Sequence, residues 1–270
     1  MNKKILVDLF LQSLKNPVKA SLYILSYILS YIDKSLGITE TAMVSGFGER
    51  LVVKNLIKAK NSNDFVVLAH IQRYEWCSTL IKGIVLDAGC GSGYGTFFLA
   101  KNSNIKAIVG VDISSQAINF ARKYFKANNL HFWKMDVRNL KFKDNYFDAI
   151  ISFDVLEHLS ETDQEKFIHE LRRVLKPEGT LIIGCPNAKV SMKNNPFHLK
   201  ELTMSEFQHL LQKYFDDVKV FGQDLMKHGK RAKEKWFTLI NDISITNLII
   251  VEDDCDTCFG LLAICKKPIK

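Results

Sequence analysis

The sequence predicts an α/β protein built on a parallel sheet with helices on both faces. Through the middle of the chain, short apolar runs alternate with helix-patterned stretches, which is the order that β-α-β units produce. Two runs, DAIISF and TLIIG, are largely apolar without alternation, as strands buried on both faces are. The length of 270 residues and the apolar content of 47% suit one domain with elaborations.

Each expected element follows from its local pattern. Strands are expected over Val85–Leu86, Ala107–Val111, Leu130–Trp133, Phe147–Phe153, Thr180–Gly184, Asp217–Phe221 and Phe259–Lys266. Helices are expected over Gln116–Lys126, Thr162–Leu175 and Thr203–Phe215. The last two helices begin with the pattern of a capping box, Thr162 with Glu165 and Thr203 with Glu206. The final two strands enclose an insertion, residues 224–254, of mixed helical or strand character.

Residues 1–45 are predicted to form a helical extension before the main domain, residues 46–270. The uncharged run from Ala20 to Ile32 is too short to span a bilayer, and it lacks a cleavage signature, so a signal peptide is not expected. Two interpretations of the extension stay open. It caps the domain or forms a dimer contact, or it lies as an amphipathic helix on a membrane. In the second case four lysines would face lipid phosphates: Lys3, Lys4, Lys15 and Lys19.

The formal charge of +8 fits either a solvated lysine-rich surface or attraction to an anionic partner. The basic run Lys227–Lys235 raises the same alternatives, a solvated helix or a grip on a substrate phosphate. The six cysteines form no disulfide pattern, which predicts a cytoplasmic protein, peripheral at the inner membrane face if the extension binds lipid. Cys255 and Cys258 are the one close pair, and a zinc site would need two further ligands.

A glycine-rich turn, VLDAGCGSGYG from Val85 to Gly95, follows the first strand. Such a turn lets a ligand press against bare backbone near a helix N-terminus. The dinucleotide fingerprint G-x-G-x-x-G does not fit the spacing, which disfavours an NAD-dependent oxidoreductase. Asp87 precedes the glycines, and a carboxylate there would repel a pyrophosphate but attract an amino group. The turn therefore predicts a nucleoside ligand that carries an ammonium.

Two further acids follow the next two strands. Asp112 ends the second strand, where an acid can accept both ribose hydroxyls, and Asp136 follows the third, where it can accept from an adenine amino group. The carboxyl ends of parallel strands meet at one edge of the sheet. Asp87, Asp112 and Asp136 therefore predict a ligand site along that edge.

Five motifs, VLDAGCGSGYG, GVDIS, KMDV, FDAIISFDVLEHL and RVLKPEGTLII, resemble those of class I S-adenosylmethionine-dependent methyltransferases. The resemblance covers Val85 to Gly184 closely and the last two strands more loosely. It implies a Rossmann-like seven-stranded methyltransferase sheet with an antiparallel ending, and S-adenosyl-L-methionine as cofactor. It places Gly89 and Gly91 near the methionine part, Asp112 at the ribose, Asp136 at the adenine and Asp154 near the methyl group. The implied cofactor-binding set is Arg73, Tyr74, Asp87, Gly89, Cys90, Gly91, Gly93, Asp112, Ile113, Asp136, Val137 and Asp154.

Three shorter stretches, GER, HIQRYEW and NPFHLKEL, resemble a bacterial subgroup associated with surface-polysaccharide and glycan biosynthesis. In that subgroup Arg73 and Tyr74 would lie on the helix before the glycine turn, where a guanidinium suits the cofactor's carboxylate. The alternative for HIQRYEW is a plain amphipathic helix.

The catalytic candidates are His158 and His198. His158 follows the fourth strand, where the methyl group should point, and an acceptor hydroxyl needs a base with a pKa near neutrality. His198 follows the fifth strand, on the side where substrate would enter. Glu157 could orient the His158 ring or bind a metal. A metal shared by Glu157, His158 and His198 is conceivable, but their spacing does not support it, and no metal ligand is predicted.

The sequence thus predicts an enzyme that O-methylates a sugar or glycan precursor, phosphorylated or lipid-linked, by in-line methyl transfer with His158 as general base. The alternative is N- or O-methylation of another small molecule, such as a quinone, amino sugar or secondary metabolite. No nucleic-acid partner is expected, because NNPFH follows the fifth strand instead of the fourth, where the similar motif of base methyltransferases would lie. A non-catalytic scaffold is disfavoured because the motifs are complete. The oligomeric state is left open.

Overall fold

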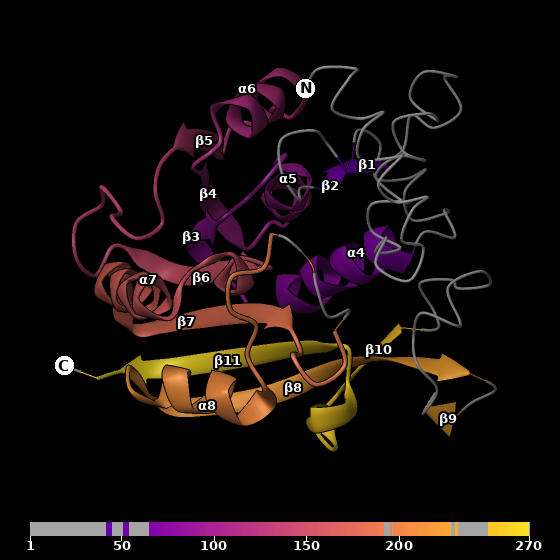
Figure 1. Cartoon of the computed structure of the whole chain (residues 1–270). Coiled ribbons are helices and arrows are strands. Elements are labelled where there is room, and N and C mark those ends of the chain that lie inside the picture. Colours follow the sequence, from indigo (N-terminus) through magenta and orange to yellow (C-terminus); the bar gives the residue numbers. More distant parts are fainter. Residues whose placement is uncertain are drawn as a thin grey trace, which may run out of the picture.

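The computed structural model describes residues 65–191, 195, 197–225 and 248–269 with their side chains, and the backbone alone of 42–44, 51–53, 226–227 and 230–231. Within this part, one mixed sheet forms the centre of the molecule (Figure 1). Its path in space is β10 (Leu248–Val251), β8 (Phe215–Lys227), β11 (Gly260–Pro268), β7 (Leu175–Pro186), β6 (Phe147–Phe153), β3 (Gly83–Ala88), β4 (Ile105–Asp112) and β5 (Leu130–Lys134), with β9 (Lys230–Arg231) paired to β8.

Strands β5, β4, β3, β6 and β7 are parallel to one another. Strand β11 lies between β7 and β8 and is antiparallel to both, and β10 is antiparallel to β8. The parallel strands therefore end at one edge of the sheet, where ligands of open α/β sheets bind. The predicted Rossmann-like sheet with an antiparallel ending is confirmed.

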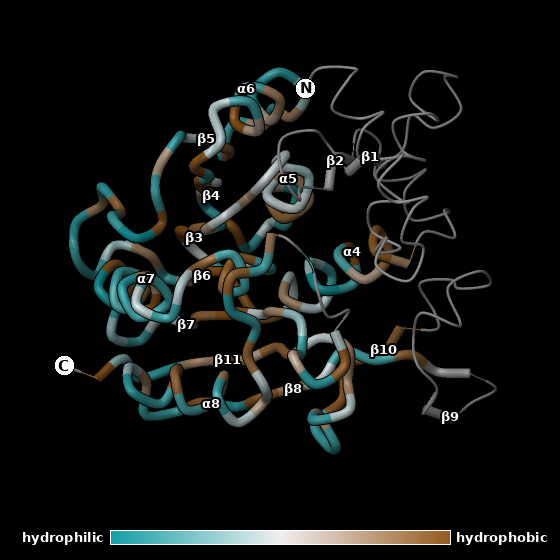
Figure 2. Tube along the Cα trace, viewed as in Figure 1, coloured by the Kyte–Doolittle hydropathy of each residue, from teal (hydrophilic) through white to brown (hydrophobic). Residues whose placement is uncertain are grey.

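Helices cover both faces of the sheet. The helices are α4 (Phe65–Ser78), α5 (Tyr94–Ala100), α6 (Ser115–Tyr124), α7 (Glu161–Val174) and α8 (Met204–Gln212), and short 3-10 turns occur at η1 (Leu156–His158) and η5 (Cys255–Thr257). Helices α7 and α8 contribute to one buried cluster, and α4, α5 and α6 contribute to the cluster on the opposite face. Figure 2 shows polar turns on the outer sides of α6 and α7.

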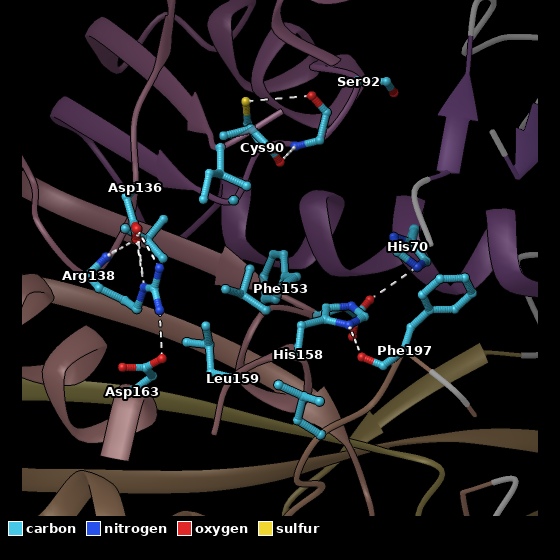
Figure 3. A pocket seen from close by; sticks show the side chains of 18 of the residues that line it. His70, Cys90, Ser92, Asp136, Arg138, Phe153, His158, Leu159, Asp163 and Phe197 are labelled. Carbon is cyan, nitrogen blue, oxygen red and sulfur yellow. Dashed lines mark hydrogen bonds and ion pairs between the residues drawn. The ribbon is translucent and has the colours of Figure 1, made fainter. Parts of the chain in front are cut away.

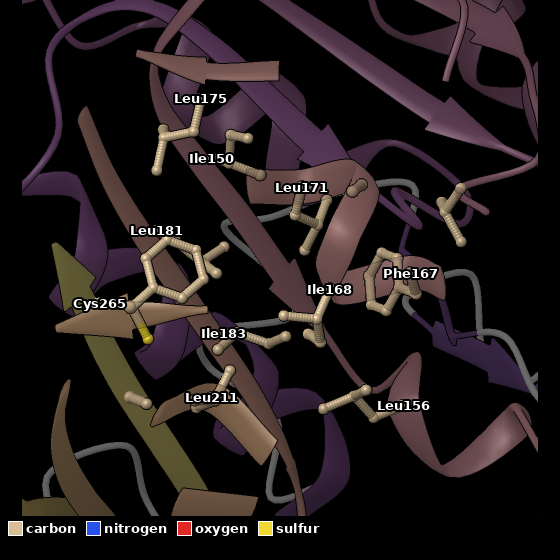
Figure 4. Close-up of a cluster of buried hydrophobic side chains, with 14 of the residues drawn as sticks. Ile150, Leu156, Phe167, Ile168, Leu171, Leu175, Leu181, Ile183, Leu211 and Cys265 are labelled. Atoms are coloured by element: carbon tan, nitrogen blue, oxygen red, sulfur yellow. The ribbon is translucent and has the colours of Figure 1, made fainter. Parts of the chain in front are cut away.

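Alternation along the buried strands divides the core between the two faces. Ile150 of β6 belongs to the cluster with α7, and the adjacent Ile151 belongs to the cluster with α4 to α6. In the first cluster, Phe167 and Leu171 of α7 pack among strand side chains that include Leu181 (Figure 4). Each of these side chains is fully buried, and burying one contributes about 1.5 to 3 kcal/mol.

The N-terminal ends of helices α7 and α8 can be compared with the two capping boxes that the sequence predicts. The box at Thr203 and Glu206 is confirmed, because the Thr203 side chain accepts from Glu206 N and the Glu206 side chain accepts from Thr203 N. The box at Thr162 is wrong. Ser160 has the extended backbone that an N-cap needs, and its side chain accepts from Asp163 N, so the helix begins at Glu161. Both residue types cap well, and only the path of the chain after η1 selects between them.

The structure describes only parts of the predicted N-terminal extension and of the insertion 224–254. Residues 42–44 of the predicted helical extension form strand β1 (Ala42–Val44), antiparallel to β2 (Leu51–Val53), so the helical prediction is wrong there; residues 1–41 lie outside the described residues. The described parts of the insertion 224–254 are mainly strands. They include β9 inside the basic run Lys227–Lys235, for which a solvated helix is one of the two sequence interpretations. The side chains of that run, and residues 232–247, lie outside the described residues. In the described chain, no helix has the length and apolarity needed to cross a membrane.

Candidate active site

A cavity of about 440 Å³ opens at the carboxyl ends of β3, β4 and β6 (Figure 3). It is lined by His70, Tyr74, Gly89, Cys90, Gly91, Ser92, Tyr94, Asp112, Ile113, Asp136, Val137, Arg138, Phe153, Asp154, Val155, His158, Leu159, Ser160, Asp163, Phe197 and Leu199. Ten of the predicted site residues are therefore brought together: Tyr74, Gly89, Cys90, Gly91, Asp112, Ile113, Asp136, Val137, Asp154 and His158. Arg73, Asp87, Gly93 and His198 are not part of the described lining.

The glycines of the turn have different physical reasons. Gly89 has φ +84°, and a Cβ there would come within 2.2 Å of the Val155 side chain. Gly91 also has a positive φ, but a Cβ there would meet no described atom within 4 Å, and Gly91 lines the cavity. Gly89 therefore permits the close packing of the turn against Val155, whereas Gly91 leaves bare backbone open to a ligand.

Asp112 holds the turn from the end of β4. Its Oδ2 accepts from Gly91 N at 3.0 Å, and its Oδ1 accepts from Ser114 N at 2.8 Å at the start of α6. The carboxylate thus joins the glycine turn to the next helix while it faces the cavity. This is the position from which a carboxylate can accept ribose hydroxyls.

Asp87 lies beneath the turn and is 1% exposed. Its Oδ2 accepts from Thr96 Oγ1 at 2.6 Å and from the Tyr74 hydroxyl at 3.5 Å, and its Oδ1 has no hydrogen-bond partner among the described atoms. Burial raises the pKa of Asp87 to about 7, although the bonds from Thr96 and Tyr74 oppose the increase. Asp87 contacts the helices behind the turn, and it does not line the cavity that its sequence position suggests.

Asp136, the acid expected at the adenine, is held by Arg138. The Arg138 guanidinium lies 2.6 Å from Asp136 Oδ2 and 2.6 Å from Asp163 Oδ2. The hydrogen bonds from Arg138 keep the pKa of Asp136 below its usual value. Ile113, which also lines the cavity, is 53% exposed and leaves an apolar side chain for an aromatic ring to contact.

A polar network crosses the cavity wall around Asp154, which has φ +54°. Arg73 Nη1 donates to both Asp154 oxygens at 2.6 and 2.7 Å, and His70 Nε2 lies 3.1 Å from Oδ2. Burial opposes ionisation, but Arg73 and His70 outweigh it and hold the pKa of Asp154 below its usual value. Arg73 therefore binds a protein carboxylate, where the sequence prediction has it facing the cofactor's carboxylate.

Sequence reasoning missed three members of this network. His70 Nδ1 lies 2.9 Å from the Tyr94 hydroxyl, and Gln223 Oε1 accepts from Arg73 Nε at 2.8 Å. His70 and Arg73 are three apart on α4, a spacing that places them on one helix face and is visible in the sequence. Gln223 comes from β8, 150 residues further along the chain, and no local signal marks it.

The two catalytic candidates lie side by side. His158 lines the cavity, and its Nδ1 lies 3.0 Å from the Phe197 carbonyl oxygen. His198 lies behind it, with the ring centres 5.2 Å apart. The structure also brings Glu157 to this pair, with ligand atoms of all three residues within 4.8 Å of one another. The sequence spacing of these residues is therefore not an argument against a shared metal site, because the loop before α8 places His198 next to η1.

Comparison with known proteins agrees with this geometry. Residues 86–183 match the family described as "Methyltransferase domain". The chain is 31% identical over 156 residues to a probable S-adenosylmethionine-dependent methyltransferase of Mycobacterium tuberculosis, covering 56% of this chain and 54% of that protein. It is 31% identical over 125 residues to the demethylmenaquinone methyltransferase of Tropheryma whipplei, covering 44% of this chain and 51% of that protein. The chain thus spans about half the length of these relatives.

Among solved structures, an S-adenosylmethionine-dependent methyltransferase from Archaeoglobus fulgidus superposes with a TM-score of 0.55 at 24% identity, covering 78% of this chain and 96% of that one. This similarity supports the fold alone. Residues 86–183 therefore match a methyltransferase domain in sequence, and the described sheet and helices have the α/β architecture of that fold. S-adenosylmethionine is the cofactor in the name of the Mycobacterium tuberculosis relative, and the open backbone of Gly91 with the Asp112 carboxylate suits a nucleoside ligand of that chemistry.

Proposed function

We propose that the protein is a methyltransferase that transfers the methyl group of S-adenosylmethionine to a hydroxyl oxygen of a sugar or glycan precursor. The observation that carries the proposal is that one cavity joins the cofactor end, Gly91 and Asp112, to the imidazole of His158. In Figure 3, Phe153 lies between Cys90 of the glycine turn and His158.

The chemistry requires an aligned displacement and the loss of one proton. The hydroxyl oxygen forms a bond to the methyl carbon, the carbon–sulfur bond breaks, and its electron pair stays on the sulfur, which becomes neutral. A hydroxyl is a poor nucleophile until its proton leaves, whereas a neutral amine needs little help. The Phe197 carbonyl oxygen can only accept a hydrogen bond, so His158 Nδ1, 3.0 Å away, carries the hydrogen of the neutral ring, and Nε2 has the lone pair that can take the proton of the acceptor hydroxyl.

A second candidate acceptor is an apolar molecule with a hydroxyl, such as a quinol. Phe197 and Leu199 line the cavity and are 42% and 68% exposed, which gives the acceptor side an apolar rim. The relative from Tropheryma whipplei is named a demethylmenaquinone methyltransferase, which supports an apolar, quinone-type acceptor.

We also propose a cytoplasmic location, with contact to the inner membrane face if residues 1–35 bind lipid, and no nucleic-acid partner. In support, all six cysteines are buried thiols, and Cys255 and Cys258 are not joined, as suits a reducing compartment.

The test is transfer of labelled methyl from S-adenosylmethionine to three acceptors: a sugar phosphate, the matching amino sugar and a demethylated quinol. Label in a sugar ether, with kcat lowered about 100-fold or more in His158→Gln, supports the proposal. His209→Gln, at an exposed position on α8, is the matched control and keeps full activity. Label in the amine alone, with His158→Gln as active as the wild type, contradicts it. Label in the quinol alone selects the second candidate.

A further inference from the structure

We propose that Glu157, His158 and His198 bind one divalent transition-metal ion at the acceptor end of the cavity, where it holds the acceptor hydroxyl. The binding site stands on its own geometry. Its role in activating the hydroxyl rests on the proposed function.

Hydrogen bonds hold η1 and the loop before α8 together at this site, although the two segments are distant in sequence. The Glu157 carbonyl oxygen accepts from Leu199 N at 2.7 Å and from Lys200 N at 3.2 Å. Gln164, buried at the start of α7, donates from Nε2 to the Leu156 carbonyl at 2.8 Å and to the Lys200 carbonyl at 2.9 Å. The two bonds to the Glu157 carbonyl join backbone to backbone, and the Gln164 side chain bridges the same two segments, so η1 and the loop before α8 keep their relative positions without a metal.

Both imidazole rings are oriented as metal-binding histidines usually are. A metal-ligating histidine typically donates its second N–H to a carboxylate or a backbone carbonyl, which directs the other nitrogen at the metal. Here His158 Nδ1 lies 3.0 Å from the Phe197 carbonyl oxygen, and His198 Nδ1 contacts the Glu201 carboxylate. Ser191 Oγ donates to the other oxygen of Glu201. Nε2 of each ring is thereby directed away from these partners.

The remaining atoms lie within reach of one ion. The three ligand atoms are within 4.8 Å of one another, and Glu157 Oε1 is 4.0 Å from His158 Nε2. Ligands about 2.1 Å from one ion lie roughly 3 to 4 Å apart, so the side chains would move inward by about 1 Å. Asn195 Nδ2 is 3.0 Å from His198 Nε2, and the ion would displace this contact. A cation would also offset the desolvation of the Glu157 carboxylate, which is 2% exposed.

The donor set selects the class of metal. Two imidazoles and one carboxylate suit Mn²⁺, Fe²⁺, Co²⁺ or Zn²⁺, whereas Mg²⁺ and Ca²⁺ prefer oxygen ligands throughout. Three protein ligands leave at least one position for another molecule. Because His158 lines the cavity, the acceptor hydroxyl can take that position.

If the acceptor hydroxyl coordinates the metal, the metal would activate it in place of a histidine base. The bound hydroxyl loses its proton to solvent water, since a divalent ion lowers the pKa of an oxygen that it binds. The resulting oxygen anion forms the bond to the methyl carbon, and the carbon–sulfur electron pair stays on sulfur. In this arrangement His158 Nε2 is a ligand and does not itself accept the proton.

The experiment is a Co²⁺ titration of untagged protein that has been freed of metal with a chelator, followed by visible absorption and by calorimetry. The proposal expects one Co²⁺ per chain with a d–d spectrum of nitrogen and oxygen ligands. It expects affinity at least 10- to 100-fold lower in His198→Gln and in Glu157→Gln, and displacement by Zn²⁺ but not by Mg²⁺. His209→Gln, outside the cluster, is the matched control and keeps the wild-type affinity. For Glu201→Gln, which removes only the carboxylate that contacts His198 Nδ1, we expect an intermediate loss of Co²⁺ affinity and a shifted spectrum.

Two results would overturn the site: absence of Co²⁺ binding in the wild type, or equal binding in the wild type, His198→Gln and Glu157→Gln. Each variant is checked for a thermal shift with S-adenosylhomocysteine, so a variant that fails to fold is recognised and Glu201→Gln carries the comparison. Failure of the proposed function gives a different pattern, in which Co²⁺ binds as expected but no hydroxyl acceptor is methylated with any metal. Methylation of a hydroxyl at full rate by chelator-treated protein would leave His158 as the base and refute the metal's role.

Discussion

Asp87 makes a quantitative prediction about stability and pH. Its carboxyl is buried beneath the glycine turn and its pKa is raised to about 7, whereas an aspartate in an unfolded chain has a pKa of about 3.9. Between about pH 4 and pH 7 the folded state therefore holds a proton that the unfolded state has lost, and the free energy of unfolding must fall as the pH rises. The stabilisation is fully present below the unfolded pKa and is lost as the pH passes the folded one.

The magnitude follows from the two pKa values. One pKa unit corresponds to about 1.4 kcal/mol, so between pH 5 and pH 8 the Asp87 carboxyl removes about 2 to 3 kcal/mol from the stability of the cofactor-free protein. Asp87→Asn keeps an oxygen that can accept from Thr96 but cannot ionise. The difference in unfolding free energy between the wild type and Asp87→Asn should therefore decline by about 2 to 3 kcal/mol from pH 5 to pH 8. Other titrating groups contribute equally to both proteins, so their contributions cancel.

Urea unfolding at pH 5, 6, 7 and 8 without cofactor measures this difference. Thr96→Val is the companion variant, because it removes a hydrogen bond that lowers the Asp87 pKa and should move the decline to higher pH. A difference between the wild type and Asp87→Asn that stays constant from pH 5 to pH 8 would refute the reasoning.

Three further predictions concern the turn and the network behind it. Gly89→Ala should prevent correct folding of the turn, because its Cβ would lie 2.2 Å from the Val155 side chain. Gly91→Ala should lower the free energy of unfolding by only about 1 kcal/mol in a thermal melt, yet calorimetry should show loss of S-adenosylhomocysteine binding. Equal effects of the two would contradict their separate roles. Arg73→Leu removes the main counter-charge of the Asp154 carboxylate and leaves only His70 beside it, which should cost up to about 3 kcal/mol in urea unfolding. The double variant Arg73→Leu, Asp154→Asn should recover part of this loss, and no recovery would show that the pair is not the cause. Asp112→Ala should abolish the thermal shift that S-adenosylmethionine gives the wild type, about 2.7 kcal/mol at ~100 times its dissociation constant, and NAD should give none.

Much of the fold could be predicted because its signals are local. The strand order along the chain, the helix at Thr203 and the glycine turn each depend on residues adjacent in sequence. The helix that begins at Glu161 shows the limit. Ser160 and Thr162 are both good N-caps, and the choice depends on how the chain leaves η1, which local pattern does not record.

By itself, the sequence determined that a parallel sheet ends in a glycine turn followed by acids at successive strand ends, because strand and turn patterns are local and parallel strands share one edge. Tertiary structure decided where the side chains point. It turned Asp87 toward Thr96, joined Arg73 to Asp154 and carried His198 back to Glu157 and His158. These contacts join residues brought together by packing of whole elements, and a side chain's direction depends on the position of every element around it.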